Sequence, residues 1–480
     1  MEYTKENTYR VLRAFNPWWS NGTVNEIFAK GYHRFGYYDA MERLRDTEMK
    51  RAVVLLGARR VGKTTIQYQM IDTLLKSGIA PNRIVFFSLD HPILKVAGLS
   101  EILELYHENV CAAQDCYYFL DEIQHEKGWE NWIKSLHDMQ PETRIIATGS
   151  ASAALNKGAS ESGVGRFANL KIPTLSFYEY CSLLGINKGI SLPTDLRPTS
   201  LLSMTRQQQS EVILKISAVQ NHLNRYLLIG GFPELAVASN DLRASKTIRE
   251  DIIDKVLKRD IPEIYEIRNL ADLERIFLYI CNITSDIVSI ESMCKELNGV
   301  SRPTAENYLR YLESANLIYI SKPVSLGNRT VLKSSPKIYI ADSAIRSAVL
   351  MDDAVTDPTE MGKIAETTVY KHVYSFFEKQ SATVGYYRGG DRNKEIDIVV
   401  STLNGKKFLI EAKYRNQAKL TDNSELAALA ADADAAFVMT KRIDDYGIQT
   451  TSGGTPILRI PTSVLLYLIG HCEKNGSELF

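Results

Sequence analysis

The chain has 480 residues, with 57 Lys plus Arg against 57 Asp plus Glu, 45% apolar residues and 24% charged residues. This balance excludes a polybasic tail binder, an acidic disordered chain and a membrane protein. At roughly 100–200 residues per domain, the length predicts about three or four domains, each with its own core.

The N-terminal residues and the cysteines indicate a cytoplasmic protein. The start, MEYTKENTYRVLRAF, lacks the basic end and apolar run of a signal peptide. No apolar stretch approaches the ~20 residues of a membrane span. The six cysteines form no CxxC pair and have no His at ligand spacing, which favours buried free thiols over a disulfide framework or a zinc site.

Residues 1–50 have the pattern of amphipathic helices with an aromatic run, Phe15 to Trp19, and predict an extension that packs on its neighbour. Over residues 51–175, short apolar runs alternate with helical stretches. Continuous apolar strands separated by helices indicate a parallel sheet covered on both faces. The predicted strands are 53–56, 84–87, 117–120, 144–147 and 168–172.

A phosphate-binding loop follows the first predicted strand. The run from Gly57 to Thr64 fits GxxxxGK(S/T) at every position and leads into a helix that begins near Thr64. Gly57 and Gly62 let backbone N–H groups turn toward a β-phosphate, while Lys63 supplies positive charge to the β- and γ-phosphates. The Thr64 hydroxyl can ligate Mg²⁺. Together with Thr65, these residues predict binding of ATP and Mg²⁺.

Polar residues flank three later strands of the same region. Asp121 and Glu122 end a buried strand, where α/β sheets bind ligands, so Asp121 is predicted to hold Mg²⁺ through its water shell and Glu122 to polarise the attacking water. Thr148 ends another strand and is either a γ-phosphate sensor or part of an ordinary turn. Arg166 precedes the last strand and is either an arginine finger for a neighbouring subunit's nucleotide or a surface arginine.

These motifs together resemble the prokaryotic extended AAA-type ATPases that carry a C-terminal domain of nuclease fold. The resemblance covers residues 51 to about 440 and rests on the runs GARRVGKTT, FLDEIQHEKGWENWIKSLHD, ATGSASA, Gly165–Arg166, IPTLSFYEY and GGFPE. It implies an additional-strand ATPase with strand order 5-1-4-3-2 and nucleotide bound between subunits of a ring or arc. Its site residues fall on Lys63, Thr64, Asp121, Glu122 and Arg166. Thr148 stands where the family usually has asparagine.

The middle of the chain is mainly helical. A polar stretch, roughly 186–210, predicts a loop within a helical lid region that extends to 260. Residues 290–320 then predict helix, turn, helix and strand, the order of a winged helix. In a DNA reader the second helix would present four side chains to the major groove: Arg302, Thr304, Asn307 and Arg310. Because that helix also carries two glutamates, a protein-packing role is favoured.

The C-terminal segment predicts a second metal site. Asp397 on one strand and the ExK sequence of Glu411 and Lys413 at the end of the next resemble the PD-(D/E)xK nuclease fold. There, two carboxylates hold Mg²⁺ and the lysine orients or deprotonates the attacking water. Nuclease-fold resemblance adds Glu366 as a further ligand or its orienter, and Arg388 as a phosphate contact. The alternatives are a surface charge cluster, or a folded but inactive nuclease domain used for docking.

The hydrophobic pattern predicts the register of this hairpin. A three-residue loop, 403–405, with Gly405 in the left-handed conformation, places the apolar residues on one face. Asp397 then lies opposite Glu411, with Lys413 beside them. The predicted apolar pairs are Ile396 with Ala412, Ile398 with Ile410, and Val400 with Phe408.

The predicted fold is multidomain α/β. Its parts are an N-terminal helical extension (1–50), an AAA-type P-loop ATPase core (51–175), a helical lid (176–260), a winged helix (261–350) and a PD-(D/E)xK nuclease-like domain (351–480). The predicted function is a Mg²⁺-dependent ATPase that forms a hexamer-like ring or arc and couples ATP turnover to a metal-dependent nuclease acting on DNA, with branched or junction DNA suggested by analogy. The competing function is a nucleotide-switched scaffold whose C-terminal domains only bind partners.

Zero net charge does not exclude DNA, because basic residues cluster around the proposed second metal site while the acids are spread along the chain. These basic residues are Arg388, Arg392, Lys394, Lys406, Lys407, Lys413, Arg415 and Lys419.

Overall fold

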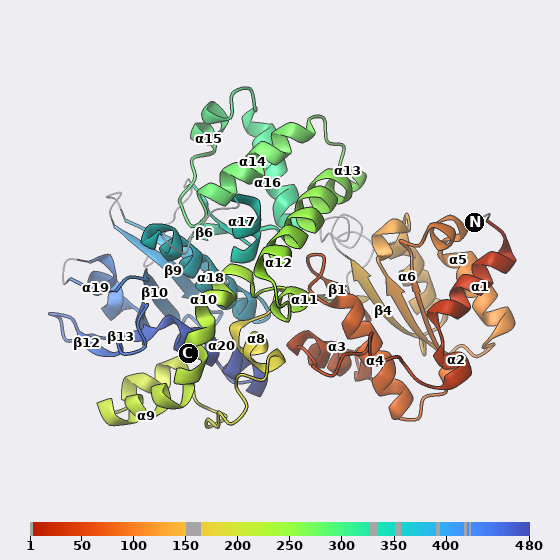
Figure 1. Ribbon diagram of the computed structural model, residues 1–480, viewed down its shortest axis with the longest axis horizontal. Helices are drawn as coiled ribbons and strands as arrows, with labels where there is room; N and C mark the ends of the chain where they lie inside the picture. The colour runs from red at the N-terminus through yellow and green to blue at the C-terminus, as the bar shows by residue number, and fades with distance from the viewer. Residues whose placement is uncertain are drawn as a thin grey trace. The chain divides into compact units, whose positions relative to one another are not determined.

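The computed structural model describes residues 3–149, 165–325, 335–350, 357–389, 394–416, 420–421 and 424–480. The chain divides into two compact units (Figure 1). The first is Met1–Pro173 with Ser314–Asn316, and the second is Thr174–Glu313 with Leu317–Phe480. The boundaries of the five predicted domains stay predictions. Within the described ranges, no helix is both long and apolar enough to cross a membrane.

The first unit is built on a parallel sheet whose strands match the five predicted apolar runs. They are β1 (Ala52–Leu56), β2 (Ile84–Ser88), β3 (Tyr117–Asp121), β4 (Arg144–Gly149) and β5 (Phe167–Lys171). Their order is β2-β3-β4-β1-β5, with parallel pairing throughout. This is the order 5-1-4-3-2 that the family resemblance implies. The carboxyl ends of β1, β3 and β4 therefore share one edge of the sheet, where ligands bind in such folds.

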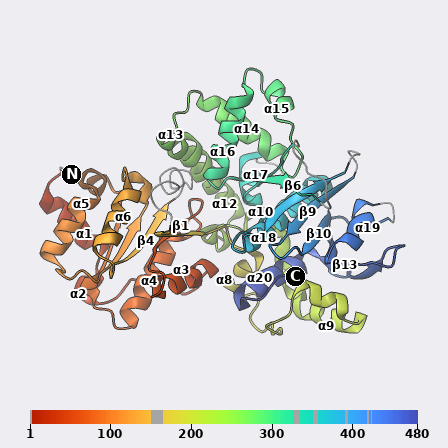
Figure 2. The same ribbon diagram turned by 180° about the vertical axis from the view of Figure 1, so that it is seen from behind.

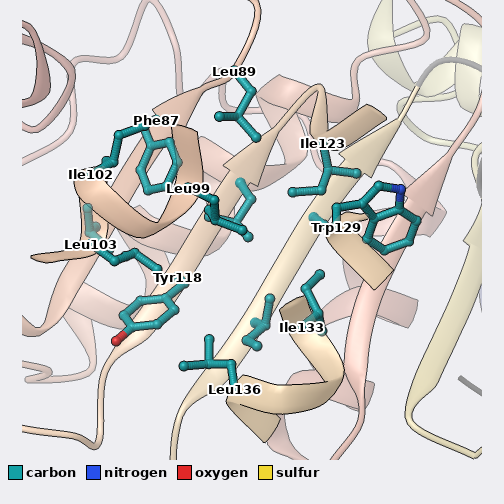
Figure 3. Close-up of a cluster of buried hydrophobic side chains, with 14 of the residues drawn as sticks. Phe87, Leu89, Leu99, Ile102, Leu103, Tyr118, Ile123, Trp129, Ile133 and Leu136 are labelled. Atoms are coloured by element: carbon teal, nitrogen blue, oxygen red, sulfur yellow. The ribbon is translucent and has the colours of Figure 1, made fainter. Parts of the chain in front are cut away.

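Helices cover both faces of this sheet. On one face, Phe87 and Tyr118 of the strands pack against α5 and α6 in a buried apolar cluster (Figure 3). On the other side α3 and α4 contact the sheet (Figure 1). The elements are α1 (Lys5–Phe15), α2 (Trp18–Asn21), α3 (Phe35–Arg45), α4 (Lys63–Lys76), η1 (Pro81–Arg83), α5 (Pro92–Asn109), η2 (Ile123–His125) and α6 (Trp129–Met139).

The N-terminal extension closes the edge strand β2. The Asn16 side-chain amide accepts a hydrogen bond from the Phe86 N–H and donates one to the Phe86 carbonyl, both at 2.7 Å. The indole N–H groups of Trp18 and Trp19 donate to the Ile84 carbonyl at 3.0 and 2.8 Å. Because β2 has a strand neighbour on one side only, these side chains satisfy main-chain groups that would otherwise lack partners. The predicted packing of the extension on its neighbour is confirmed.

The second unit is built on an eight-stranded mixed sheet in the order β12-β13-β11-β10-β9-β8-β6-β7 (Figure 2). The strands are β6 (Ile318–Pro323), β7 (Lys337–Ile340), β8 (Thr383–Arg388), β9 (Glu395–Ser401), β10 (Lys407–Lys413), β11 (Ala435–Thr440), β12 (Gly447–Thr450) and β13 (Pro456–Pro461). Helices α18 (Pro358–Glu378), α19 (Glu425–Leu429) and α20 (Thr462–Asn475) contact this sheet. Along the chain, α18 is followed by β8–β10, α19 and β11.

The remaining elements of this unit are mostly helical. They are α8 (Phe177–Leu183), η3 (Pro198–Ser203), α9 (Arg206–Ile216), η4 (Ser217–Val219), α10 (Gln220–Ile229), α11 (Pro233–Ala236), α12 (Asp241–Ile248), the π-helix η5 (Arg249–Asp260), α13 (Ile261–Ile264), α14 (Leu270–Asn282), α15 (Ile290–Glu296), α16 (Arg302–Ser314), α17 (Ser343–Leu350) and η6 (Ala430–Asp432). All six cysteines are free, and all but the half-buried Cys294 are buried.

The predicted winged helix is not confirmed as a separate fold. Its helix, turn, helix and strand are present as α15, α16 and β6. However, β6 pairs antiparallel with β7 and parallel with β8. The strand expected to form a wing is largely apolar, and it extends the C-terminal sheet instead of standing apart from it.

A buried ion pair between Lys371 and Asp342 anchors Thr174, the first residue of the second unit. Lys371 of α18 donates to Asp342 at 2.9 Å, to the Thr174 hydroxyl at 3.1 Å and to the Tyr226 hydroxyl at 3.0 Å. A Cβ at Gly231 would lie 1.7 Å from an Asp342 carboxylate oxygen, so only glycine fits there. Two runs behind the family resemblance, IPTLSFYEY and GGFPE, therefore meet around one compensated buried charge.

Substitution of Asn16 by alanine should destabilise the first unit. The change leaves the N–H and carbonyl of Phe86 without their side-chain partners in a buried position, and we expect a loss of about 1–3 kcal/mol in the free energy of unfolding. Urea denaturation followed by fluorescence measures it. The control, Asn21→Ala, removes an exposed amide of the same segment and should stay within about 0.5 kcal/mol of the parent. Equal losses in the two variants would contradict the edge-closing role.

Candidate nucleotide site and carboxylate cluster

The phosphate-binding loop connects β1 to α4. A Cβ at Gly57 would lie 2.3 Å from the Ile172 carbonyl oxygen, and Gly62 has a φ of +94°, so the backbone requires glycine at both positions. Lys63 and the half-buried Thr65 belong to the first turn of α4, and no side chain caps this helix at Gly62. Such a helix start directs main-chain N–H groups toward a bound phosphate. The Lys63 ammonium lies over the loop, donating to the Gly57 and Ala58 carbonyls at 2.9 and 3.0 Å.

Residues from α4, β3 and β4 converge on the buried Asp121 carboxylate. The Thr64 hydroxyl donates to Asp121 Oδ1 at 3.0 Å. The fully buried Thr148 hydroxyl donates to the same oxygen at 2.6 Å and accepts the Glu122 N–H at 3.0 Å. Thr148 therefore holds both acids in place, a role that differs from the predicted γ-phosphate contact. A hydroxyl beside a carboxylate at a helix start is a donor set that fits Mg²⁺ with a nucleotide.

The two acids have pKa values on opposite sides of their ordinary values. Burial, with the neighbouring Glu122 charge, raises the pKa of Asp121 to about 6. Burial also acts to raise the pKa of Glu122, but Lys63 and the Gln124 amide hold it below its ordinary value. Glu122 is therefore ionised near pH 7, as a residue that polarises water must be. Its backbone is left-handed, with φ +54°, a conformation that is costly for this residue type and is found at functional sites.

Arg34, which sequence reasoning missed, supports the phosphate-binding loop. This buried side chain precedes α3 and donates from Nη1 to the Val61 carbonyl at 2.6 Å. The extension thus contributes to the geometry of the loop in addition to packing. An isolated arginine 27 residues before its partner gives no pattern that would connect the two in the sequence.

Arg166 lies just before β5 and pairs with Asp138 of α6. Its guanidinium donates twice to that carboxylate, at 2.9 and 3.1 Å, and both side chains are partly exposed. Within one chain Arg166 is a surface residue held by a neighbouring acid. A reach to the nucleotide of another subunit stays a prediction.

The predicted second metal site contains an unexpected lysine. Lys337 of β7 is 2% exposed, and its Nζ lies 2.8 Å from Glu366, 2.7 Å from Glu395 and 3.0 Å from Asp397. Burial alone would lower the pKa of Lys337, but these carboxylates hold it well above its ordinary value. We name these four residues the Lys337 cluster. The sequence feature that could identify Lys337 is its place at the first position of a buried strand, where a charge is costly unless it is paired.

The hairpin register is confirmed up to Ile398. The predicted pairs of Ile398 with Ile410 and Val400 with Phe408 form, and Gly405 has a φ of +81° in the loop. Beyond that point the prediction is wrong, because the pairing of β9 with β10 ends at Ile398.

A β-bulge in β9 explains this departure. Gly385 pairs with Val399 and Tyr387 with Ile396, so β9 has one more residue than β8 between these pairs. Ile396 then joins the core cluster of Val399. Asp397 Oδ2 accepts the Ala412 N–H at 2.8 Å instead of facing Glu411 in the ladder. Bulges commonly re-aim a side chain in this way.

The predicted ligand set of Glu366, Asp397 and Glu411 is not assembled around a common point. Lys413 Nζ lies 2.5 Å from Glu411 Oε1, whereas Glu366 and Asp397 face Lys337. Across the described residues, no three His, Cys, Asp or Glu side chains are placed to hold a metal ion. Burial, with the charge of Asp397, raises the pKa of Glu366 to about 8 and that of Glu411 to about 7. The predicted ligand set does not form because the lysine ammonium groups already engage these carboxylates.

A protein-family model matches most of the first unit. Residues 49–181 match the model of the AAA domain family. The chain carries an AAA-type P-loop domain. Two further matches are to domains of unknown function, DUF8612 over residues 220–356 and DUF4143 over residues 361–462. Their descriptions name neither a winged helix nor a nuclease.

Similar proteins occur in archaea and bacteria. An uncharacterised protein of Methanocaldococcus jannaschii is 25% identical over 77% of this chain and 77% of its own length. One from Haemophilus influenzae is 24% identical over 81% of this chain and 95% of its own length. Both alignments are long enough to extend beyond the AAA domain, so the relatives share more than this module.

Among solved structures, AMPPCP-bound DnaA from Aquifex aeolicus is similar to 62% of this chain and 92% of its own, with 17% identity and a TM-score of 0.27. The RuvB Holliday junction branch migration motor of Thermotoga maritima covers 64% and 94%, with 16% identity and a TM-score of 0.28. The family match over residues 49–181 carries the assignment of the AAA domain.

Substitution of Thr148 by valine should destabilise the nucleotide site. The variant keeps the side-chain shape but leaves the Glu122 N–H without its partner and removes one of the two hydroxyls that donate to Asp121 Oδ1, at an expected cost of about 1–3 kcal/mol. Denaturant unfolding measures this loss. Thr148→Ser retains the hydroxyl and should recover more than half of the difference. A valine variant as stable as the parent would exclude the positioning role of Thr148.

Proposed function

We propose that this protein is a Mg²⁺-dependent ATPase. The observation that carries the proposal is the convergence of Thr64, Thr148 and the buried Asp121 carboxylate beside Lys63, within a domain that matches the AAA family. Thr64 and Asp121 are the residues that would hold Mg²⁺, which when bound neutralises charge on the β- and γ-phosphates.

Four residues of the nucleotide site have distinct parts in ATP hydrolysis. Lys63 exchanges its loop carbonyls for the β- and γ-phosphate oxygens. The Glu122 carboxylate orients the attacking water and accepts its proton. Thr148 keeps Glu122 aligned by accepting its N–H, and Arg34 holds the loop through the Val61 carbonyl.

The proposal includes assembly into a ring or arc, with Arg166 as a finger. Its support is the position of this partly exposed guanidinium directly before β5. In an assembled state Arg166 would exchange the Asp138 carboxylate for the phosphate of a neighbouring subunit, one anion for another. Stabilisation of the developing phosphate charge would then depend on the contact between subunits.

Glu122→Gln should separate binding from hydrolysis. We expect kcat for ATP hydrolysis to fall about 10²–10⁴-fold, because the amide cannot accept the proton of the attacking water. Binding of a fluorescent ATP analogue should be retained, whereas Lys63→Ala should lose it. The control is Glu126→Gln, four residues further on, whose side chain accepts the Leu99 N–H and can still do so as an amide. Parent-like turnover by Glu122→Gln would remove Glu122 from its role.

A second proposed function is DNA binding by the second unit. The observation that favours it is a set of basic residues at one end of the sheet. Because β9 and β10 are antiparallel, Lys394 at the start of β9 and Arg415 after β10 belong to the same sheet end as Lys413, and both are exposed. Arg388 ends the neighbouring strand β8. Two members of the predicted basic cluster, Arg392 and Lys419, lie outside the described residues.

The double variant Lys394→Ala/Arg415→Ala should weaken DNA binding. Two lost phosphate contacts should reduce the slope of log K against log salt by about 2, with a similar loss for different DNA sequences. Fluorescence anisotropy with linear and four-way DNA at several salt concentrations measures both effects. The control, Lys215→Ala/Arg243→Ala, removes the same charge from exposed positions on α9 and α12. Equal slopes in both double variants would argue against this surface.

A further inference from the structure

We propose that the Lys337 ammonium replaces the divalent cation of a nuclease-type carboxylate site, so that the C-terminal unit holds its carboxylates together without metal and does not cleave phosphodiesters. The inference goes beyond the proposed ATPase and does not depend on it. It also argues against cleavage, one of the two C-terminal roles that the sequence leaves open.

Lys337 has as many N–H donors as it has carboxylate partners. An ammonium has three N–H donors and no acceptor. Nζ has three carboxylate partners, Glu366, Glu395 and Asp397, all within 3.0 Å. These partners come from α18 and from β9, and the lysine comes from β7. Three elements thus meet on one central cation, which is the structural task that a bound Mg²⁺ performs when carboxylates from separate elements ligate it.

Protein cations already engage the carboxylates that a metal would need. Mg²⁺ requires near-octahedral oxygen ligands at about 2.0–2.1 Å. Asp397 gives one oxygen to Lys337 and the other to the Ala412 N–H. Glu411 gives Oε1 to Lys413, and its buried Oε2 has no hydrogen-bond partner in the described part of the chain. Each of the four carboxylates has an oxygen beside the Lys337 or Lys413 ammonium, and these positive charges oppose the binding of a doubly charged ion.

Lys337 is a fixed part of the fold. Its strand β7 pairs with β6 along its whole length, with Lys337 opposite Ser321. Two residues further on, the Tyr339 hydroxyl donates to Glu366 at 2.9 Å, and its ring stacks on Tyr370 with centroids 4.0 Å apart. The backbone of Lys337 is held by a paired strand, and its side chain, 2% exposed, lies among its carboxylate partners.

The test is metal binding by the nucleotide-free, full-length protein. Isothermal titration with Mn²⁺ should show no site in the parent, and its thermal midpoint should be the same in EDTA and in Mg²⁺. Lys337→Met removes the charge but keeps an unbranched side chain, which leaves the carboxylates without their cation. We expect this variant to gain one Mn²⁺ site per chain, and its midpoint to rise by about 5–10 °C at a Mg²⁺ concentration of about 100 Kd.

The control is Lys371→Met, which empties a similarly buried position whose lysine has one carboxylate partner, Asp342. It should lose stability without gaining a Mn²⁺ site. Measurements on the parent keep the test decisive even if Lys337→Met does not fold. A Mn²⁺ site in the parent that Glu366→Gln removes would overturn the proposal. So would Mg²⁺-dependent cleavage of linear, flapped or four-way DNA by the parent that Glu411→Gln abolishes. ATP hydrolysis has no bearing on these outcomes, so the two proposals fail independently.

Discussion

The cost of removing charge from water shapes both units of this protein. An isolated charge in a protein interior is so unfavourable that it either finds partners or changes its protonation state. The buried charges here find partners: Asp121 is held by two threonine hydroxyls, Lys371 by Asp342 and two hydroxyls, and Lys337 by three carboxylates. Segments far apart in the chain are brought together at each of these points.

The two units satisfy this constraint in different ways, and the difference bears on their chemistry. In the first unit the Lys63 ammonium donates to the Gly57 and Ala58 carbonyl oxygens, which phosphate oxygens can replace with a gain in charge interaction. In the Lys337 cluster the cation has as many carboxyl partners as it has N–H donors. A site of the first kind is prepared for an anionic ligand, whereas one of the second kind already has its partners, and removing any one of them would be destabilising.

Much of this organisation can be predicted from the sequence where it depends on local patterns. The five strands of the first sheet and the loop from Gly57 to Thr64 follow from apolar runs and glycine spacing, and the hairpin register follows from alternation as far as Ile398. The bulge at Asp397 could not be predicted, because it depends on how β8 pairs with β9. Lys337 and Arg34 were missed for a related reason: their partners are distant in the sequence, and a single basic residue has no periodicity.

The closure of β2 by Asn16 and the two tryptophans has a consequence for how the AAA domain can be isolated. The family match begins at residue 49, which suggests a fragment starting there. Such a fragment would lack the side chains that cover Ile84 and Phe86, and its outermost strand would present bare main-chain donors and acceptors to solvent. Exposed edges of this kind recruit strands from other molecules, so the fragment would tend to self-associate and precipitate. By covering the edge of β2, the first 50 residues therefore reduce the tendency of the domain to aggregate.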